Sequence, residues 1–161
     1  MANEQEVKQE LISKFAIPED KIVVQRARRI FADVPIERFR EILGHVINNM
    51  KFDSLGTITG IDDGPMLGAI YHMARQDGTV LSLRIHTPRA NPVIKTITDL
   101  YPAATMYERE LVDLLGIKVE GLPKGDRYPL TDDWPLDEHP LRKDWPKQPK
   151  TPDQAEEKKN G

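Results

Sequence analysis

Residues 54–87, SLGTITGIDDGPMLGAIYHMARQDGTVLSLRIHT, contain three apolar stretches that are separated by two turn sequences. The turns are Asp-Asp-Gly-Pro at 62–65 and Gln-Asp-Gly at 76–78, and both are typical of β-hairpins. The last stretch, 79–87, alternates apolar and polar residues, which predicts a strand with one buried face. Three such strands joined by short turns form an antiparallel meander. A sheet of this kind needs a cover on its apolar face.

Helical patterns flank the meander on both sides. Apolar residues recur at helical spacing in 4–15, 34–50 and 105–115, and we expect a shorter helical segment at 93–100. Residues 22–32, in which apolar residues surround three arginines, predict one further strand. The chain is therefore expected to adopt an α+β fold, in which an antiparallel sheet of about four strands is covered by helices.

The C-terminal part of the chain differs in composition. Seven of the 13 prolines lie in the last 41 residues, which argues against regular helix or a central strand there. We therefore expect an α+β body at 1–118, followed by an extended proline-rich C-terminal arm at 119–145. Residues 146–161 carry no apolar anchor and are expected to be disordered.

Composition excludes several classes of function. The chain has 161 residues and a formal net charge of −3, which argues against nucleic acid as a partner. It has no cysteine, so disulfides, thiolate zinc sites and cysteine-ligated iron–sulfur clusters are excluded. No apolar stretch approaches the roughly 20 residues of a membrane helix, and we expect a soluble, intracellular domain.

No cofactor is expected either. The sequence lacks a glycine-rich phosphate loop, and its histidines lie on different predicted elements. A metal site needs several ligands in one place, so each histidine is better explained as a surface or half-buried residue. These histidines are His45, His72, His86 and His139.

The helix predicted at 105–115 carries an unusual density of charge. Thr105 and Glu108 have the spacing of a capping box, and Arg109 and Asp113 have the spacing of an ion pair on one helix face. Spacing alone favours a solvated face for these residues. The alternative is acid–base catalysis by Glu108, Glu110 and Asp113, which requires a pocket that shifts their pKa values.

The arm contains the two tryptophans of the chain, Trp134 and Trp145. Disordered segments are normally poor in large aromatic residues, because they have nothing to bury them against. Two interpretations are open. The tryptophans anchor the arm on a partner protein, which we favour, or the arm folds back and the tryptophans cover the core of their own domain.

Two motifs resemble a known family. Residues 107–117, YERELVDLLGI, and residues 140–144, PLRKD, are similar to the 30 kDa subunit of respiratory complex I, the NADH-quinone oxidoreductase. Residues 129–135, PLTDDWP, look more like the corresponding part of membrane-bound group 4 [NiFe] hydrogenases and related ferredoxin-dependent complexes. The complex I family usually has a histidine-proline and paired arginines soon after the glycine, and EGLPKGDRY at 120–128 departs from this pattern. The departure favours a hydrogenase-like relative.

The resemblance implies an α+β subunit that binds no cofactor and has no catalytic residue of its own. It implies assembly into the hydrophilic arm of a redox complex, peripherally on the cytoplasmic side of the cell membrane. The implied partners are a [NiFe]-hydrogenase-like large subunit and a small iron–sulfur subunit, with the membrane arm reached indirectly. The residues expected to contact partners are Glu108, Arg109, Glu110, Asp113, Trp134, Pro140, Leu141, Arg142, Lys143, Asp144 and Trp145.

Two alternatives to this function remain open at the level of sequence. One is a free-standing soluble enzyme that uses Glu108, Glu110 and Asp113 as acid–base groups. The other is a generic adaptor whose arm binds an unrelated partner. The sequence does not identify an electron donor or acceptor, because that chemistry belongs to other chains of such a complex.

Overall fold

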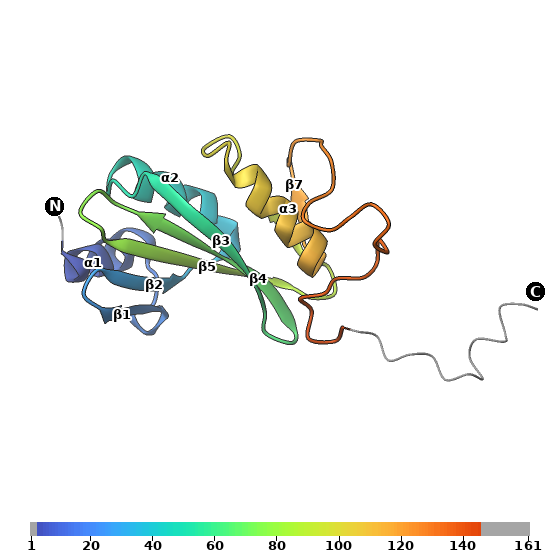
Figure 1. Ribbon diagram of the computed structural model, residues 1–161. Helices are drawn as coiled ribbons and strands as arrows, with labels where there is room; N and C mark the ends of the chain where they lie inside the picture. Colours follow the sequence, from blue (N-terminus) through green and yellow to red (C-terminus); the bar gives the residue numbers. More distant parts are fainter. Residues whose placement is uncertain (1–2, 146–161) are drawn as a thin grey trace, which may run out of the picture.

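The computed structural model describes residues 3–145 and shows a sheet with helices packed against it (Figure 1). Its longer helices lie where the sequence predicted them, although the second is shorter than expected and is preceded by a turn of 3₁₀ helix. The helical elements are α1 (Glu4–Phe15), η1 (Glu19–Lys21), η2 (Ile36–Arg38), α2 (Phe39–Asn48) and α3 (Ala104–Leu115).

The main sheet has five strands in the order β1-β2-β5-β4-β3. The predicted meander is confirmed, because the central strand β4 pairs antiparallel with both β3 and β5. Strand β2, which lies between β1 and β5, pairs with β5 in parallel, so the sheet is mixed and not purely antiparallel. These strands are β1 (Ile22–Arg26), β2 (Arg29–Asp33), β3 (Ser54–Asp62), β4 (Met66–Ala74) and β5 (Val80–Pro88).

The prediction of a single strand at 22–32 was wrong, because the chain reverses within it to form the β1–β2 hairpin. Arg28 adopts a left-handed conformation with φ of 61° in the turn. Its backbone amide donates a hydrogen bond of 2.6 Å to the carboxylate of Glu4 on α1. Turns of this kind normally use glycine or asparagine, so the sequence carries no local signal for the reversal.

One face of the sheet forms the core. In register, Ile22, Ala32, Leu83, Tyr71 and Ile58 make a continuous row across all five strands, and each is buried. The buried positions of α1, α2 and α3 join the same hydrophobic cluster. All three helices therefore cover one face, as Figure 1 shows.

A second, smaller sheet positions α3. Strands β6 (Val93–Lys95) and β7 (Lys118–Glu120) pair in parallel, and α3 is the helix that connects them. A helical crossover is the usual way to join parallel strands. The expectation of helix at 93–100 was wrong, because three residues of strand are too few to show a period of two. Residues 121–145 contain turns but no helix or strand.

The hydroxyl of Tyr71 gives a test of the core. Within residues 3–145 it is the one buried side-chain polar atom without a hydrogen-bond partner, and burial raises the pKa of Tyr71 well above its ordinary value. Tyr71→Phe should raise the free energy of unfolding by about 1 kcal/mol, because an unsatisfied buried hydroxyl is removed. Urea denaturation followed by circular dichroism would measure the change.

Tyr101→Phe is the matched control. The hydroxyl of Tyr101 donates a hydrogen bond of 3.3 Å to the carbonyl of Phe52, so its removal should lower the free energy of unfolding by about 1 kcal/mol. A loss of stability in both variants would mean that the hydroxyl of Tyr71 is satisfied, which would contradict its unpaired state in the core.

Candidate docking surface

The first glutamate of the α3 motif is a structural residue. Glu108 has no exposed surface, and its carboxylate accepts hydrogen bonds from the amide of Ile97 at 2.7 Å and the hydroxyl of Thr96 at 2.5 Å. Burial raises the pKa of Glu108, and these two hydrogen bonds oppose the rise. The predicted capping box is absent, because Thr105 donates instead to the carbonyl of Pro102 at 2.8 Å. Glu108 thus ties the segment after β6 to α3.

The aspartate of the motif holds the arm. Asp113 is 7% exposed, and its carboxylate accepts hydrogen bonds from Arg127 Nε at 3.0 Å and from the amide of Leu130 at 3.1 Å. The predicted pair between Asp113 and Arg109 on the helix face is not formed, because Arg127 of the arm occupies the carboxylate. The backbone carbonyl of Asp113 accepts a further hydrogen bond of 2.8 Å from His139 Nδ1.

The arm also covers the C-terminal end of α3. The amide of Leu141 donates to the carbonyl of Leu114 at 3.0 Å, and Arg142 Nε donates to the carbonyl of Leu115 at 2.7 Å. Last-turn carbonyls lack partners within their own helix and attract cations. Gly116 ends the helix with φ of 65°, as predicted, and a Cβ there would lie 2.4 Å from His139. Only glycine fits this position.

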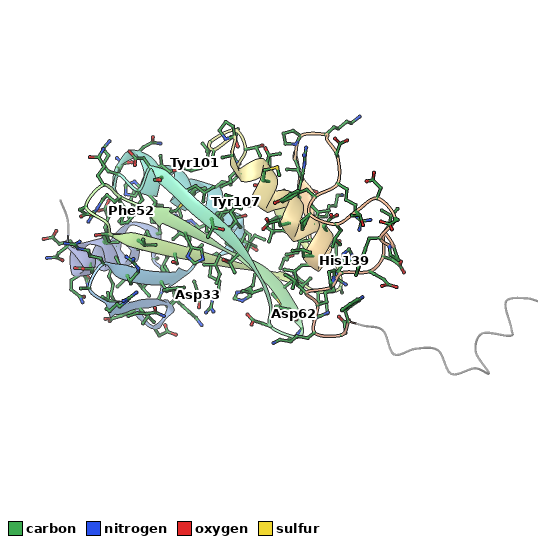
Figure 2. The ribbon with its side chains drawn as sticks, in the orientation of Figure 1. Asp33, Phe52, Asp62, Tyr101, Tyr107 and His139 are labelled. Atoms are coloured by element: carbon green, nitrogen blue, oxygen red, sulfur yellow. The ribbon has the colours of Figure 1, made fainter. Side chains whose placement is uncertain are left out.

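The arm next reaches the tip of the β3–β4 hairpin (Figure 2). The carboxylate of Asp62 pairs with Arg89 and accepts hydrogen bonds from the amides of Lys143 at 2.8 Å and Gly64 at 2.9 Å. Although burial opposes ionisation, these hydrogen bonds lower the pKa of Asp62 to about 2. Arg89 also bridges to Asp144 at 3.0 Å. The sequence marked Asp62 only as a turn residue, so this contact could not be foreseen.

The two tryptophans pack against each other. Their ring centroids are 5.8 Å apart, and both indole nitrogens donate to Glu138, Trp134 at 3.0 Å to its carbonyl and Trp145 at 3.2 Å to its carboxylate. Arg127 also donates to the carbonyl of Trp134 at 2.5 Å. Neither tryptophan belongs to the described core cluster. The arm therefore folds back on the body, as one interpretation expected, but its tryptophans do not cover the core.

Folding back leaves apolar side chains of the arm in solvent. Leu136 is 84% exposed and Leu141 is 57% exposed, while Pro140 is half-buried. Leu141 also lines a hollow of about 230 Å³ between β3 and α3, which is bordered by the half-buried Glu110. Exposed leucines next to a hollow are typical of surfaces that contact another protein.

The acidic residues considered for catalysis do not converge on one pocket. Glu110 lines the hollow beside β3, Asp113 lines a second hollow beside the arm, and Glu108 lines neither. Within residues 3–145, no group of three or more histidine and acidic residues is arranged to hold a metal ion. No helix of that range is long and apolar enough to cross a membrane.

The histidines make separate contacts. His45 lies 2.6 Å from Glu10, His86 lies 2.8 Å from Asp63, and His139 contacts the α3 backbone as described above. His72 sits between the hydroxyls of Ser82 and Thr59 on the face of the sheet opposite to the helices, and partial burial lowers its pKa. The role of His139 in holding the arm leaves no local signal in the sequence, because the contact spans 26 residues.

The comparisons with known proteins agree with the motifs at α3 and in the arm. Residues 32–151 match the model of a family described as "Respiratory-chain NADH dehydrogenase, 30 Kd subunit". The chain belongs to this family. It is 33% identical over 133 residues to the corresponding subunit of the F420H2 dehydrogenase of Methanosarcina mazei, and the match covers 78% of this chain and 84% of that protein.

Two further relatives are parts of membrane-bound complexes. The membrane-bound hydrogenase subunit beta of Pyrococcus furiosus is 27% identical over 132 residues, which covers 76% of this chain and 75% of that protein. A chain of the membrane-bound sulfane sulfur reductase, an archaeal respiratory membrane complex, superposes with a TM-score of 0.76 at 27% identity. The match covers 87% of this chain and 84% of that one. Members of this family are subunits of oxidoreductase complexes and not stand-alone enzymes.

The ion pair of Asp113 gives a test of how the arm is held. Asp113→Asn should lower the free energy of unfolding by about 3 kcal/mol, because Arg127 loses its partner in a largely buried place. Both tryptophans lie in the arm, so their fluorescence should shift to longer wavelength as the arm loosens. Asp126→Asn, at an exposed arm residue, is the control and should change neither property. An unchanged fluorescence maximum in Asp113→Asn would contradict this role.

Asp62 makes attachment of the arm dependent on pH. Its pKa falls from 3.8 to about 2 in the folded protein, so the ionised carboxylate stabilises the fold fully above about pH 4. This contribution is lost as the pH falls through 2. Between pH 5 and pH 2, the melting temperature of the wild type should therefore fall more steeply than that of Asp62→Asn. Parallel slopes for the two proteins would show that Asp62 carries no such linkage.

Proposed function

We propose that this chain is a non-catalytic assembly subunit in the hydrophilic arm of a membrane-bound redox complex. It docks on a [NiFe]-hydrogenase-like large subunit and a small iron–sulfur subunit, and it lies peripherally on the cytoplasmic side of the membrane. Membership of the 30 kDa subunit family supports a place in such a complex. The chain binds no cofactor and carries no catalytic residue in this proposal.

The observation that carries the proposal is the way in which the arm is fixed. Its polar groups bind the body at Asp113, at the end of α3 and at Asp62, while Leu136 and Leu141 remain exposed. An arm held in place before binding loses little conformational entropy when it docks. Its exposed leucines then supply apolar contacts, and its charges set the register on the partner.

The enzyme alternative has less support. The carboxylates of Glu108 and Asp113 accept hydrogen bonds from other residues of this chain. Glu110 lines the hollow beside β3, which is not the one that Asp113 lines. A general acid or base must reach a substrate, usually within hydrogen-bond distance in a shared pocket. Buried carboxylates with internal partners instead stabilise the fold.

The test is co-purification with the complex from the native cells, with surface variants of the full chain. Leu136→Asp combined with Leu141→Asp should leave the melting temperature within a few degrees of the wild type. Recovery of the large and small subunits on the tagged chain should fall by at least about tenfold, because two apolar contacts are replaced by desolvated charges.

Val23→Asp is the matched control, because Val23 is an apolar residue that is 51% exposed on the far edge strand β1. It should co-purify with the complex as the wild type does. Deletion of the whole arm is a weaker test, because it would leave Asp113 and the end of α3 without their partners. A double variant that still recovers both subunits would refute docking through the arm.

A further inference from the structure

The side chain of Arg109 on α3 lies against the arm at the Lys124-Gly125-Asp126 segment. It is half-buried, and a Cβ atom built on Gly125 would lie only 1.8 Å from one of its terminal nitrogens and 2.6 Å from its central carbon. Any residue other than glycine at 125 would displace the guanidinium. The arm backbone therefore forms one wall of a narrow site around Arg109.

The guanidinium of Arg109 has no acceptor within residues 3–145. No hydrogen bond or ion pair joins it to another described residue, and the nearest acid on its own helix face, Asp113, is paired with Arg127. A guanidinium carries five N–H donors and remains charged at any physiological pH. Because these donors bind no acceptor among the described residues, they are available to an anion from outside the chain.

The surroundings of Arg109 define what this anion would be. Arg109 lines a hollow of about 470 Å³ between α3, β7 and the arm. With Asp113 and Arg127 neutralising each other, the remaining charges of the hollow are those of Arg109, Lys118, Lys124 and Asp126, which leaves a positive excess. Its wall is also apolar, and it includes the exposed side chains of Leu136 and Tyr128. The hollow combines positive charge with apolar surface.

We propose that this hollow receives an acidic side chain of a neighbouring subunit, whose carboxylate binds Arg109 while an adjacent apolar side chain packs on Leu136. A guanidinium binds a carboxylate through two parallel hydrogen bonds, which sets both position and orientation. This inference rests on the proposed function and deepens it, because it names one contact and the chemistry of its partner. The two α3 residues next to Arg109, Glu108 and Glu110, lie outside the hollow.

The experiment uses zero-length carbodiimide cross-linking, which joins an amine to a carboxylate only when the two are in contact. Arg109→Lys places an amine in the hollow of the otherwise intact complex. After treatment of the purified complex, peptide mass spectrometry should find position 109 joined to an aspartate or glutamate of another subunit. Arg26→Lys, on the exposed β1–β2 hairpin, is the control and should give no such link.

A second variant measures the contribution to assembly. Arg109→Gln keeps hydrogen-bond donors but removes the charge, and recovery of the partner subunits should fall by at least about tenfold. Arg109→Lys should restore part of this loss. The melting temperature and tryptophan fluorescence of the isolated Arg109→Gln chain should match the wild type, because Arg109 makes no ion pair within the described residues.

The outcomes separate the two proposals. If the wild-type chain does not co-purify with a large and a small subunit, both proposals are wrong. If it does, but Arg109→Gln assembles equally well or the amine at position 109 links only within its own chain, the carboxylate site is wrong and the assembly function stands. A link from position 109 to another subunit, together with the loss in Arg109→Gln, supports the site.

Discussion

The ion pair between Asp113 and Arg127 is the contact on which the placement of the arm depends. Both side chains are largely buried, and removal of two charges from water costs several kcal/mol for each ion. The cost is offset only while the carboxylate also accepts the amide of Leu130 and the guanidinium also donates to the carbonyl of Trp134. Helix α3 and the arm therefore stabilise each other, because the buried charge on each needs the other as its partner.

This dependence explains how a long segment without helix or strand, residues 121–145, keeps a defined path. Backbone groups that are removed from water need partners, and regular structure normally supplies them. Here the partners come from α3 and from the β3–β4 tip, at the carbonyls of Leu114 and Leu115 and the carboxylate of Asp62. The prolines of the arm contribute by restricting the unfolded chain, so that less entropy is lost when the path is fixed. The arm therefore packs as an extension of the βαβ unit that β6, α3 and β7 form, and it depends on that unit for its path.

The sequence predicted those parts of the fold that depend on neighbouring residues. Alternation and turn chemistry were sufficient for β3, β4 and β5, and helical spacing with a glycine stop was sufficient for α3. The parallel pairing of β2 with β5 joins segments that lie far apart in the chain, and no local pattern records it. The β1–β2 turn was missed because its left-handed residue is Arg28 and its support comes from Glu4.

The same distinction applies to the candidate surface. Sequence spacing identified the charged residues of α3 and the arm, but it paired them with their neighbours along the helix. A pair at i and i+4 on an exposed helix contributes only about 0.2–0.5 kcal/mol. Arg127 of the arm meets Asp113 where both side chains are largely shielded from solvent, and there a charge-assisted hydrogen bond is stronger. Arg127 is therefore the partner of Asp113 in place of Arg109. Long-range partners of this strength cannot be inferred from spacing alone.

The result is a division of roles among the charges of one helix. Glu108 and Asp113 face inward, where they fix the segment after β6 and the arm. Because Asp113 is paired with Arg127 of the arm, Arg109 has no acidic partner within residues 3–145, and the arm backbone at Gly125 closes one side of its site. The ion pair that orders the arm thus also leaves Arg109 beside it without an acceptor among the described residues. A change that weakened the Asp113–Arg127 ion pair would leave the Asp113 carboxylate free to bind Arg109. Arg109 would then no longer be available to a carboxylate from outside the chain.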